Sequence, residues 1–319
     1  MQLRKKERAA SLRLHGTWKQ RTARELAKNH RLWVLLAPML IYYILFHYLP
    51  LYGIQIAFRN YKPVFGITGS DWVGLKHFVT FFKSYYSARL ILNTFFLNLL
   101  NLAIGFPIPI FLAIMLNQLM SNRAKRLMQT IIYVPHFIST VVMVGILVLF
   151  LNPTNGLINR VIEAFGGESI YFMLEPGWFR PLFVLSDVWQ HAGWSSILYI
   201  AALMGIDQSL YEAAAIDGAN KRQKIRNIDI PSLMPIATMM LILSCGALLA
   251  SNTDKALLMQ NSGNMSVSDI IGVYVYNQGL GKAQYSYTAA INLFINVINF
   301  VLIISVNWIA RKLSDNSLF

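Results

Sequence analysis

The amino-acid sequence predicts an all-α fold, that of a polytopic membrane protein with six transmembrane helices. Of its 319 residues, 55% are hydrophobic and only 13% are charged, whereas an ordinary soluble domain carries about 25% charged residues. Several uncharged stretches exceed the roughly 20 residues that cross the hydrocarbon core of a bilayer. The basic residues fall in segments that alternate with loops holding few of them, which is the positive-inside pattern of a membrane chain.

The net charge of +14 is concentrated on the segments that we expect to face the cytoplasm. Ten of the 28 Lys and Arg residues precede residue 32, and others lie at 123–126, 221–226 and 311–312. This distribution places both termini in the cytoplasm and argues against a nucleic-acid role. The single cysteine, Cys245, excludes an internal disulfide. The first apolar run is too long for a signal peptide, so none is expected.

Six apolar segments are expected to cross the membrane, namely residues 32–58, 90–117, 128–151, 181–206, 231–251 and 285–310. Pro38 and Pro50 in the first are tolerated because neighbouring helices or water can satisfy the freed carbonyls. In the second, Pro107 and Pro109 are expected to kink or interrupt the helix.

The segments between these spans are assigned to one side of the membrane by their charge. Residues 59–89, 152–179 and 252–284 are expected outside, the second with room for one short amphipathic helix and the third with a surface helix at 267–282. We therefore predict a single transmembrane domain. It covers residues 32–310, between a basic cytoplasmic arm at 1–31 and a short cytoplasmic tail at 311–319.

Asparagines recur on one face of two predicted spans. Asn93, Asn98 and Asn101 of the second span fall within an arc of about 140°. Five polar residues of the sixth span fall within an arc of about 100°: Thr288, Asn292, Asn296, Asn299 and Asn307. Such stripes either hydrogen-bond neighbouring helices, at roughly 0.6–2 kcal/mol per contact, or line a pathway for a polar solute.

Motifs of catalysis are missing from the sequence. It has no G-x-x-x-x-G-K-[ST], H-E-x-x-H, CxxC or G-x-S-x-G pattern. The six histidines are scattered without ligand spacing, so no metal site is expected. Asp187 is the one acidic residue inside a predicted span. It indicates either a pathway or relay, or a hydrated and hydrogen-bonded cap near the outer end of its helix.

The cytoplasmic loop at 207–231 carries the most informative pattern. Good helix formers, Glu212 to Ala215, are followed by Gly218 where a short helix would end. A basic stretch follows, and Pro231 then opens the next apolar run at a position suited to a first helical turn. The loop therefore predicts a helix, a glycine turn and a second helix, too small to fold without a docking partner.

The spacing of this loop resembles the EAA loop of permease subunits from binding-protein-dependent ABC importers. That pattern is E-A-A, three residues, G, nine residues, I-x-L-P, and the sequence departs from it only at Ile230, where leucine is usual. Further segments at 46–61, 93–98, 186–203 and 285–294 are similar to the carbohydrate-uptake branch of the family, in particular to permeases that import complex oligosaccharides with a lipoprotein receptor.

The resemblance implies that the loop seats in a groove on a separate ATPase subunit, which binds the ATP, so that this chain needs no cofactor of its own. The residues carried over for this coupling are Glu212, Ala213, Ala214, Asp217, Gly218 and Ala219. It also implies a second homologous permease subunit, an extracellular solute-binding lipoprotein and a carbohydrate substrate. The chain would lie among the lipids of the cell membrane.

A solute pathway would draw on polar and aromatic residues of three spans. Trp189, His191 and Trp194 offer flat faces for a sugar ring, although interfacial anchoring is another role of such residues. The candidate set is Asn98, Asn101, Trp189, His191, Trp194, Asn292, Asn296 and Asn299.

The alternative is a membrane enzyme of glycosyl or lipid transfer with Asp187, His191 and Glu212 as acid and base groups. The predicted topology places Asp187 and Glu212 on opposite sides of the bilayer, which favours transport. A secondary transporter would normally show inverted repeats, and none is evident in the sequence.

Overall fold

The computed structural model describes residues 28–250 and 252–313, and these are mostly helical. The predictions for residues 1–27 of the basic arm and 314–319 of the tail lie outside the described residues. The all-α prediction needs one correction. A two-stranded antiparallel hairpin, β1 (Arg59–Lys62) and β2 (Gly66–Trp72), occupies the loop at 59–89 and is followed by the short helix α4 (Lys76–Lys83).

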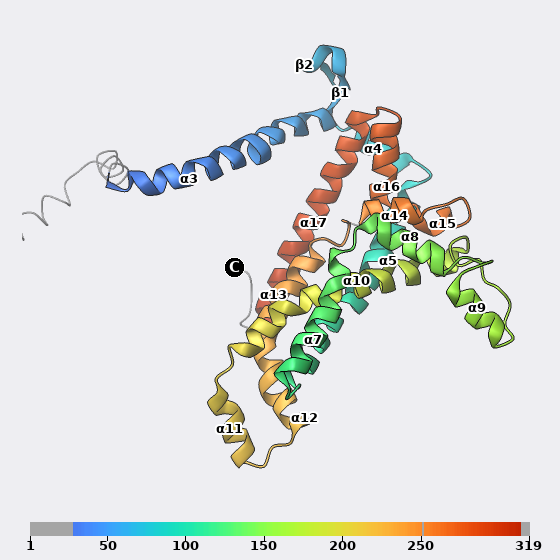
Figure 1. Cartoon of the computed structure of the whole chain (residues 1–319). Coiled ribbons are helices and arrows are strands. Elements are labelled where there is room, and N and C mark those ends of the chain that lie inside the picture. The colour runs from blue at the N-terminus through green and yellow to red at the C-terminus, as the bar shows by residue number, and fades with distance from the viewer. Residues whose placement is uncertain (1–27, 251, 314–319) are drawn as a thin grey trace, which may run out of the picture.

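The first span begins with α3 (His30–Tyr43) and continues through a π-helical turn, η1 (Ile44–Tyr48), into η2 (Leu49–Phe58). The α3 helix has no buried residue and extends away from the other helices (Figure 1). The second span consists of α5 (Ser87–Gly105) and α6 (Pro107–Asn117), which are interrupted at Phe106 as the two prolines predicted.

The third predicted span is not one straight helix. It contains α7 (Asn122–Tyr133), η4 (Val134–Phe137) and α8 (Thr140–Phe150), and the chain bends by 98° before α8. The bend follows from local chemistry. The ring of Pro135 lies in η4, the backbone of Ile138 is extended, and Ser139 accepts a hydrogen bond from the Val142 N–H as the N-cap of α8. The short amphipathic helix expected in the next loop is α9 (Leu157–Ala164).

The segment predicted as the fourth span forms α10 (Pro176–Met204), which lies at the centre of the bundle. It contacts α5, α6, α7 and η4, and also α13 (Ile230–Cys245), α14 (Thr253–Met259) and α15 (Met265–Ser268). Gly193 makes one of these contacts possible, since a Cβ atom there would lie 1.9 Å from the Ile132 carbonyl oxygen of α7. The remaining spans are α13 (Ile230–Cys245) and α17 (Tyr285–Leu313), with the loop helices α11 (Gln208–Ile216) and α12 (Lys221–Lys224) at the far end of the bundle from the hairpin (Figure 1).

The segment at 252–284, for which a surface helix at 267–282 was predicted, is more extensively folded and partly buried. It forms α14 (Thr253–Met259), α15 (Met265–Ser268), α16 (Ile271–Tyr276) and a π-helical turn, η6 (Asn277–Gly281). Several of its residues belong to a hydrophobic core with Leu97, Phe179 and Phe183, namely Ala256, Met259, Ile270 and Val273. The apolar residues in this segment are interleaved with polar ones, so its mixed composition hid the burial.

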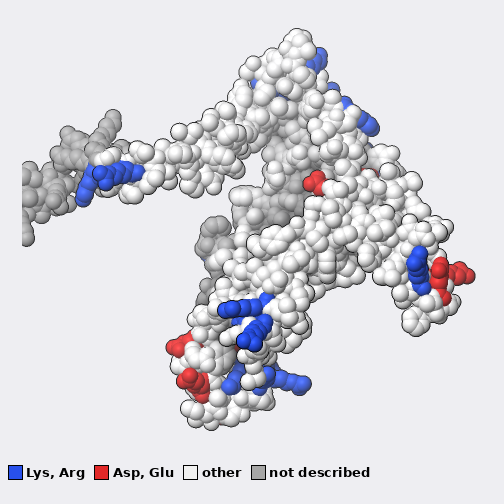
Figure 2. All heavy atoms as spheres, in the orientation of Figure 1, with Lys and Arg blue, Asp and Glu red and all other residues white. Residues whose placement is uncertain are grey.

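Four helical segments of the described chain are long and apolar enough to cross a membrane. They are His30–Phe58, Ser87–Asn117, Lys221–Cys245 and Tyr285–Lys312, and a fifth is counted if α7 to α8 is one bent span. Charged residues gather at the two ends of the molecule and on α9, and the visible middle of the bundle is almost free of them (Figure 2). This distribution is that of a polytopic membrane protein.

Candidate functional site: coupling loop and polar cavity

The helix predicted around Glu212 is α11, and it stands at the exposed end of the bundle. The Asp207 carboxylate caps it by accepting a hydrogen bond from the Ser209 N–H at 3.0 Å, which holds the pKa of that carboxyl below its ordinary value. The helix ends at Ile216 and is followed, after the C-cap Asp217, by Gly218, whose φ of 74° lies in the left-handed region that favours glycine. The predicted helix and glycine turn are therefore both present.

The predicted coupling residues lie together on this loop, and most are exposed: Glu212, Ala213, Asp217 and Gly218 are exposed, and Ala214 and Ala219 are half-buried. The apolar side chain of Ile216 is 88% exposed. An apolar side chain that protrudes beside an exposed glutamate is suited to contact with another protein.

The second half of the loop is not a separate helix, contrary to the sequence prediction. Asn220 and Gln223 form a reciprocal capping box, with hydrogen bonds of 3.0 and 2.7 Å, at the start of α12. From there the helix continues through a π-helical turn, η5 (Ile225–Asp229), into α13 without interruption. Pro231 thus lies inside a helix that begins at Lys221, and the basic residues 221–226 are its first turns.

A hydrogen-bond network that the sequence did not indicate connects this loop to the bundle. The carboxylate of Asp229 is fully buried and accepts hydrogen bonds from the Tyr211 hydroxyl and, at 2.9 Å, from Gln118 Nε2. Burial and the neighbouring carboxylate raise the pKa of Tyr211 well above its ordinary value. These contacts join residues that are 18 and 111 positions apart, so no local pattern could have predicted them.

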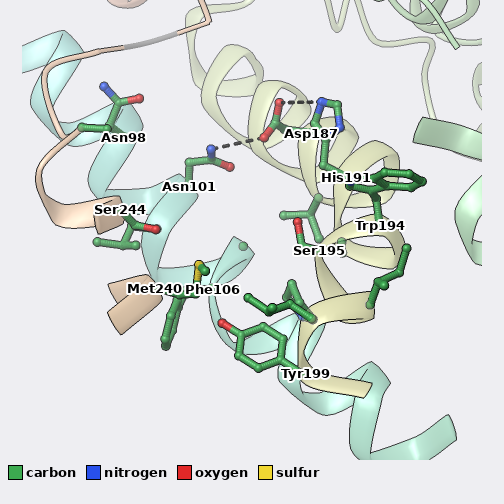
Figure 3. Close-up of a pocket in the computed structure, with 18 of the residues that line it drawn as sticks. Asn98, Asn101, Phe106, Asp187, His191, Trp194, Ser195, Tyr199, Met240 and Ser244 are labelled. Atoms are coloured by element: carbon green, nitrogen blue, oxygen red, sulfur yellow. Dashed lines mark hydrogen bonds and ion pairs between the residues drawn. The ribbon is translucent and has the colours of Figure 1, made fainter. Parts of the chain in front are cut away.

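A cavity of about 760 Å³ lies between α5, α6, α10 and α13. Four of the predicted pathway residues line it, namely Asn98, Asn101, His191 and Trp194. The side chains of Asn101 and His191 converge on the Asp187 carboxylate at one end, and Tyr199 lies toward the other (Figure 3).

The Asp187 carboxylate is held by three side chains from three elements. Asn101 donates to its Oδ2 atom at 3.2 Å, and the Lys255 ammonium lies 3.4 Å and the His191 ring 4.0 Å from its Oδ1 atom. The Lys255 side chain is fully buried, where it also donates to the Phe183 carbonyl at 2.9 Å. Asp187 was expected to be either part of a pathway or relay or a hydrogen-bonded cap, and this geometry agrees with the hydrogen-bonded cap. An acidic residue inside a span implies a cation nearby, and that expectation could have led to Lys255.

A second histidine extends this cluster. The Nδ1 atoms of His136 and His191 lie 3.1 Å apart, and the His136 ring stacks on Trp194 with centroids 4.5 Å apart and planes within 5°. The indole face of Trp194 is therefore covered on one side by His136. An aromatic surface of this kind lies beside the cavity that Asn101 and Asp187 line.

The other predicted pathway residues lie away from this cavity. Trp189 is 53% exposed on α10, and Asn292 and Asn296 are exposed on α17. Asn299 is half-buried and accepts a hydrogen bond from the Leu249 N–H at 3.2 Å, the interhelical alternative of the sequence analysis. Asn98 lines the cavity and also donates to the Leu248 carbonyl at 2.8 Å.

Comparison with known proteins identifies the family of this chain. Residues 105–315 match the family described as binding-protein-dependent transport system inner membrane component. The chain is 40% identical over 295 residues to the polygalacturonan/rhamnogalacturonan transport system permease protein YteP of Bacillus subtilis, with 92% of each chain covered. It is 40% identical over 294 residues to the protein LplB of the same organism, again with 92% of each chain covered.

A solved structure shares the fold over nearly the whole chain. A bacterial ABC transporter involved in the import of the acidic polysaccharide alginate contains a chain with a TM-score of 0.85 and 35% identity, and the match covers 92% of this chain and 99% of that one. The membrane-enzyme alternative is thereby set aside. The chain belongs to the inner-membrane components of binding-protein-dependent transport systems, and it is a multi-pass permease subunit of an ABC transporter.

Proposed function

We propose that this permease subunit serves an ATP-driven importer of an oligosaccharide or other carbohydrate, and that ATP is bound and hydrolysed by separate ATPase subunits. The substrate class is supported by the relatives. YteP is a transporter of polygalacturonan and rhamnogalacturonan by name, the alginate transporter imports an acidic polysaccharide, and the protein AraP of Bacillus subtilis, 26% identical over 284 residues, is named for arabinooligosaccharides.

The observation that carries the coupling role is the exposure of α11. It projects from the end of the bundle with Glu212 and Ile216 uncovered, and it buries none of its own residues. A short helix in this position receives displacement from a partner bound to it and passes it to α10 and α13, its neighbours in the chain. Glu212, Ala213, Ala214, Asp217, Gly218 and Ala219 are the residues that we assign to the ATPase contact.

The topology that we propose has six spans with both termini in the cytoplasm. The four long apolar helices and the bent pair α7–α8 supply five, and the 29-residue helix α10 supplies the sixth. The polar residues of α10 are accommodated because it lies at the centre of the bundle, where they have partners. The basic arm at 1–31 and the tail at 311–319 then lie on the same side as α11.

A second permease subunit is supported by the position of α3. Its apolar side chains, among them Leu35 and Phe46 of the following turn, are exposed at 77% and 65%. Lipid can cover such a helix, but its separation from the bundle leaves room for a homologous subunit between them (Figure 1). We assign Asn292 and Asn296, exposed on α17, to a pathway shared with that subunit.

The outer end of the molecule, with the hairpin and α4, is the face that we assign to a solute-binding lipoprotein. The alginate transporter has been solved in complex with a periplasmic protein that holds an alginate pentasaccharide, and its chain in that structure is 34% identical to this one. The carbohydrate would then pass to Asn98, Asn101, His191 and Trp194 at the cavity, and would meet Trp189 only where it is exposed on α10, outside the cavity.

The coupling role is tested by reversing the charge of Glu212. We expect the Glu212→Lys variant to lose the ATPase subunits on affinity purification of the permease from detergent. The matched control is Glu168→Lys, which makes the same charge change at an exposed glutamate of the outer loop. Equal recovery of the ATPase with wild type and with Glu212→Lys would refute the coupling role.

The pathway is tested by uptake in proteoliposomes that contain the whole transporter. Trp194→Ala and Asn101→Leu remove a ring face and a polar group from the cavity, and we expect uptake to fall or its order of preference among a panel of glycans to change. Phe165→Ala, which removes an exposed ring at the end of α9, away from the cavity and the hairpin, is the control. Unchanged uptake and preference in both cavity variants would show that the cavity is not on the pathway.

A further inference from the structure

The buried carboxylate of Asp229 lies where the loop helix α11 meets two helices of the membrane bundle. Its Oδ1 atom accepts the hydroxyl of Tyr211, which lies on α11, and its Oδ2 atom accepts Gln118 Nε2, at 2.9 Å, from the end of α6. Asp229 itself is the last residue of the π-helical turn that leads into α13. One side chain therefore connects three elements.

Burial of the Asp229 carboxylate is energetically costly because both of its hydrogen-bond partners are neutral. No Lys or Arg in the part of the chain that the structure describes forms an ion pair with Asp229, and its side chain has no exposure to water. A carboxylate out of water is stable only where donors satisfy its oxygens. Its position is therefore tied to the positions of Tyr211 and Gln118.

The connection matters because little else holds α11 in place. No residue of α11 is buried, although Tyr211 is half-buried. Tyr211 also forms a side-chain hydrogen bond with Asn117 at the end of α6. The helix joins the rest of the chain at Gly205 and Ile206 on one side and at the left-handed Gly218 on the other. Glycine at such a junction permits rotation. A force on α11 would rotate the helix about its ends unless a side chain fixed it to the bundle.

We propose that Asp229 is the joint through which α11 displaces α6 and α13 together, with Tyr211 and Gln118 as its positioning residues. The inference rests on the proposed coupling role of α11 and adds the path by which the displacement enters the membrane helices. The π-helical turn at 225–229 agrees with it, because such turns are local departures from regular α-helix that occur often at functional positions.

The first test is Tyr211→Phe, which removes one hydroxyl and keeps the ring. The complete transporter, reconstituted in proteoliposomes, is assayed for uptake and for ATP hydrolysis. We expect the ATPase subunits to remain bound and basal hydrolysis to persist, while the molecules taken up per ATP fall about tenfold, the effect of one lost hydrogen bond to a charged group. Tyr171→Phe, at an exposed tyrosine in the loop after α9, is the matched control.

The second test changes the pH dependence of coupling, which a purely structural contact would leave unaltered. Gln118→Glu places two carboxylates within hydrogen-bond distance, where both cannot ionise. In this variant, uptake per ATP should fall as the pH rises from about 6 to about 8. In the wild type, uptake per ATP should not change over that range. The Gln118→Glu/Asp229→Asn double variant restores one donor and one acceptor, and we expect it to abolish the pH dependence.

The outcomes separate this inference from the proposed function. Wild-type uptake per ATP in Tyr211→Phe, together with a level pH profile in Gln118→Glu, would overturn the joint and leave the coupling role of Glu212 intact. Retention of the ATPase by Glu212→Lys would instead refute the coupling role. A variant that does not co-purify with the ATPase subunits would also overturn the joint, since we expect assembly to be preserved.

Discussion

Removal of the buried lysine of α14 tests the polar cluster beside the cavity. In Lys255→Met the chain keeps a flexible side chain of similar length but loses the ammonium, which lies 3.4 Å from Asp187 Oδ1, 2.9 Å from the Phe183 carbonyl and 4.7 Å from the centroid of the Phe183 ring. Asp187 is then left with Asn101 and a histidine 4.0 Å away.

The expected loss in the free energy of unfolding is about 2–4 kcal/mol. Breaking a buried ion pair by removing one partner costs about 3–5 kcal/mol, because the other charge stays without compensation. The Asp187 side chain keeps 18% of its exposure, so water in the cavity recovers part of that cost. For a chain of 319 residues, whose entropy of unfolding is about 0.7 kcal/mol/K, the loss corresponds to a fall in Tm of roughly 3–6 °C.

The assay is thermal unfolding of the purified permease complex in detergent, followed for Lys255→Met, Asp187→Asn and the double variant. If the two side chains interact, the double variant should lose less than the sum of the single losses, by about 1–3 kcal/mol. Lys282→Met, at an exposed lysine of the same outer segment, should leave Tm unchanged. Additive losses in the double variant, or a Tm of Lys255→Met equal to that of the wild type, would refute the reasoning.

Three further predictions concern the helix contact at Gly193, the Tyr211 hydroxyl and the Gly218 turn. Gly193→Ala should lower the free energy of unfolding by about 1–3 kcal/mol, and with it the Tm of the complex, because the new methyl group would meet the Ile132 carbonyl. Gly177→Ala, whose methyl group would meet nothing within 4 Å, should leave the Tm unchanged. In an alkaline titration, the absorbance of the Tyr211→Phe variant is subtracted from that of the wild type. This difference should not change through pH 10.0, the ordinary pKa of tyrosine, because the pKa of Tyr211 is raised. The stability that this hydrogen bond contributes is complete below pH 10.0 and is lost as the pH rises through the pKa of Tyr211 in the folded state. A difference that titrates at pH 10.0 would count against the buried hydrogen bond. Gly218→Ala should weaken ATPase binding and Gly218→Asn should weaken it less, because a left-handed φ costs about 1–2 kcal/mol for most residues and asparagine tolerates it; equal binding by both variants and the wild type would contradict this.

The sequence by itself determined the features that depend on neighbouring residues. Apolar runs longer than a bilayer located four helices that are long and apolar enough to cross it, together with the bent pair α7–α8. The prolines 107 and 109 located the interruption between α5 and α6, and the E-A-A and glycine spacing located α11 and its turn. These features follow from hydropathy, ring geometry and backbone freedom, which act within a few residues. The family resemblance came from the same local patterns.

Only the tertiary structure decided which polar residues meet. Lys255 lies in a segment of mixed composition, and its partner Asp187 is 68 positions away, so its burial depends on how α14 packs against α10. In the same way, the asparagines of the two predicted stripes have different surroundings. Asn101 lines the cavity, whereas Asn299 accepts a hydrogen bond from the backbone before α14. The periodicity of a helix places a residue on a face, but the element opposite that face determines whether the side chain meets a backbone, a charge or water.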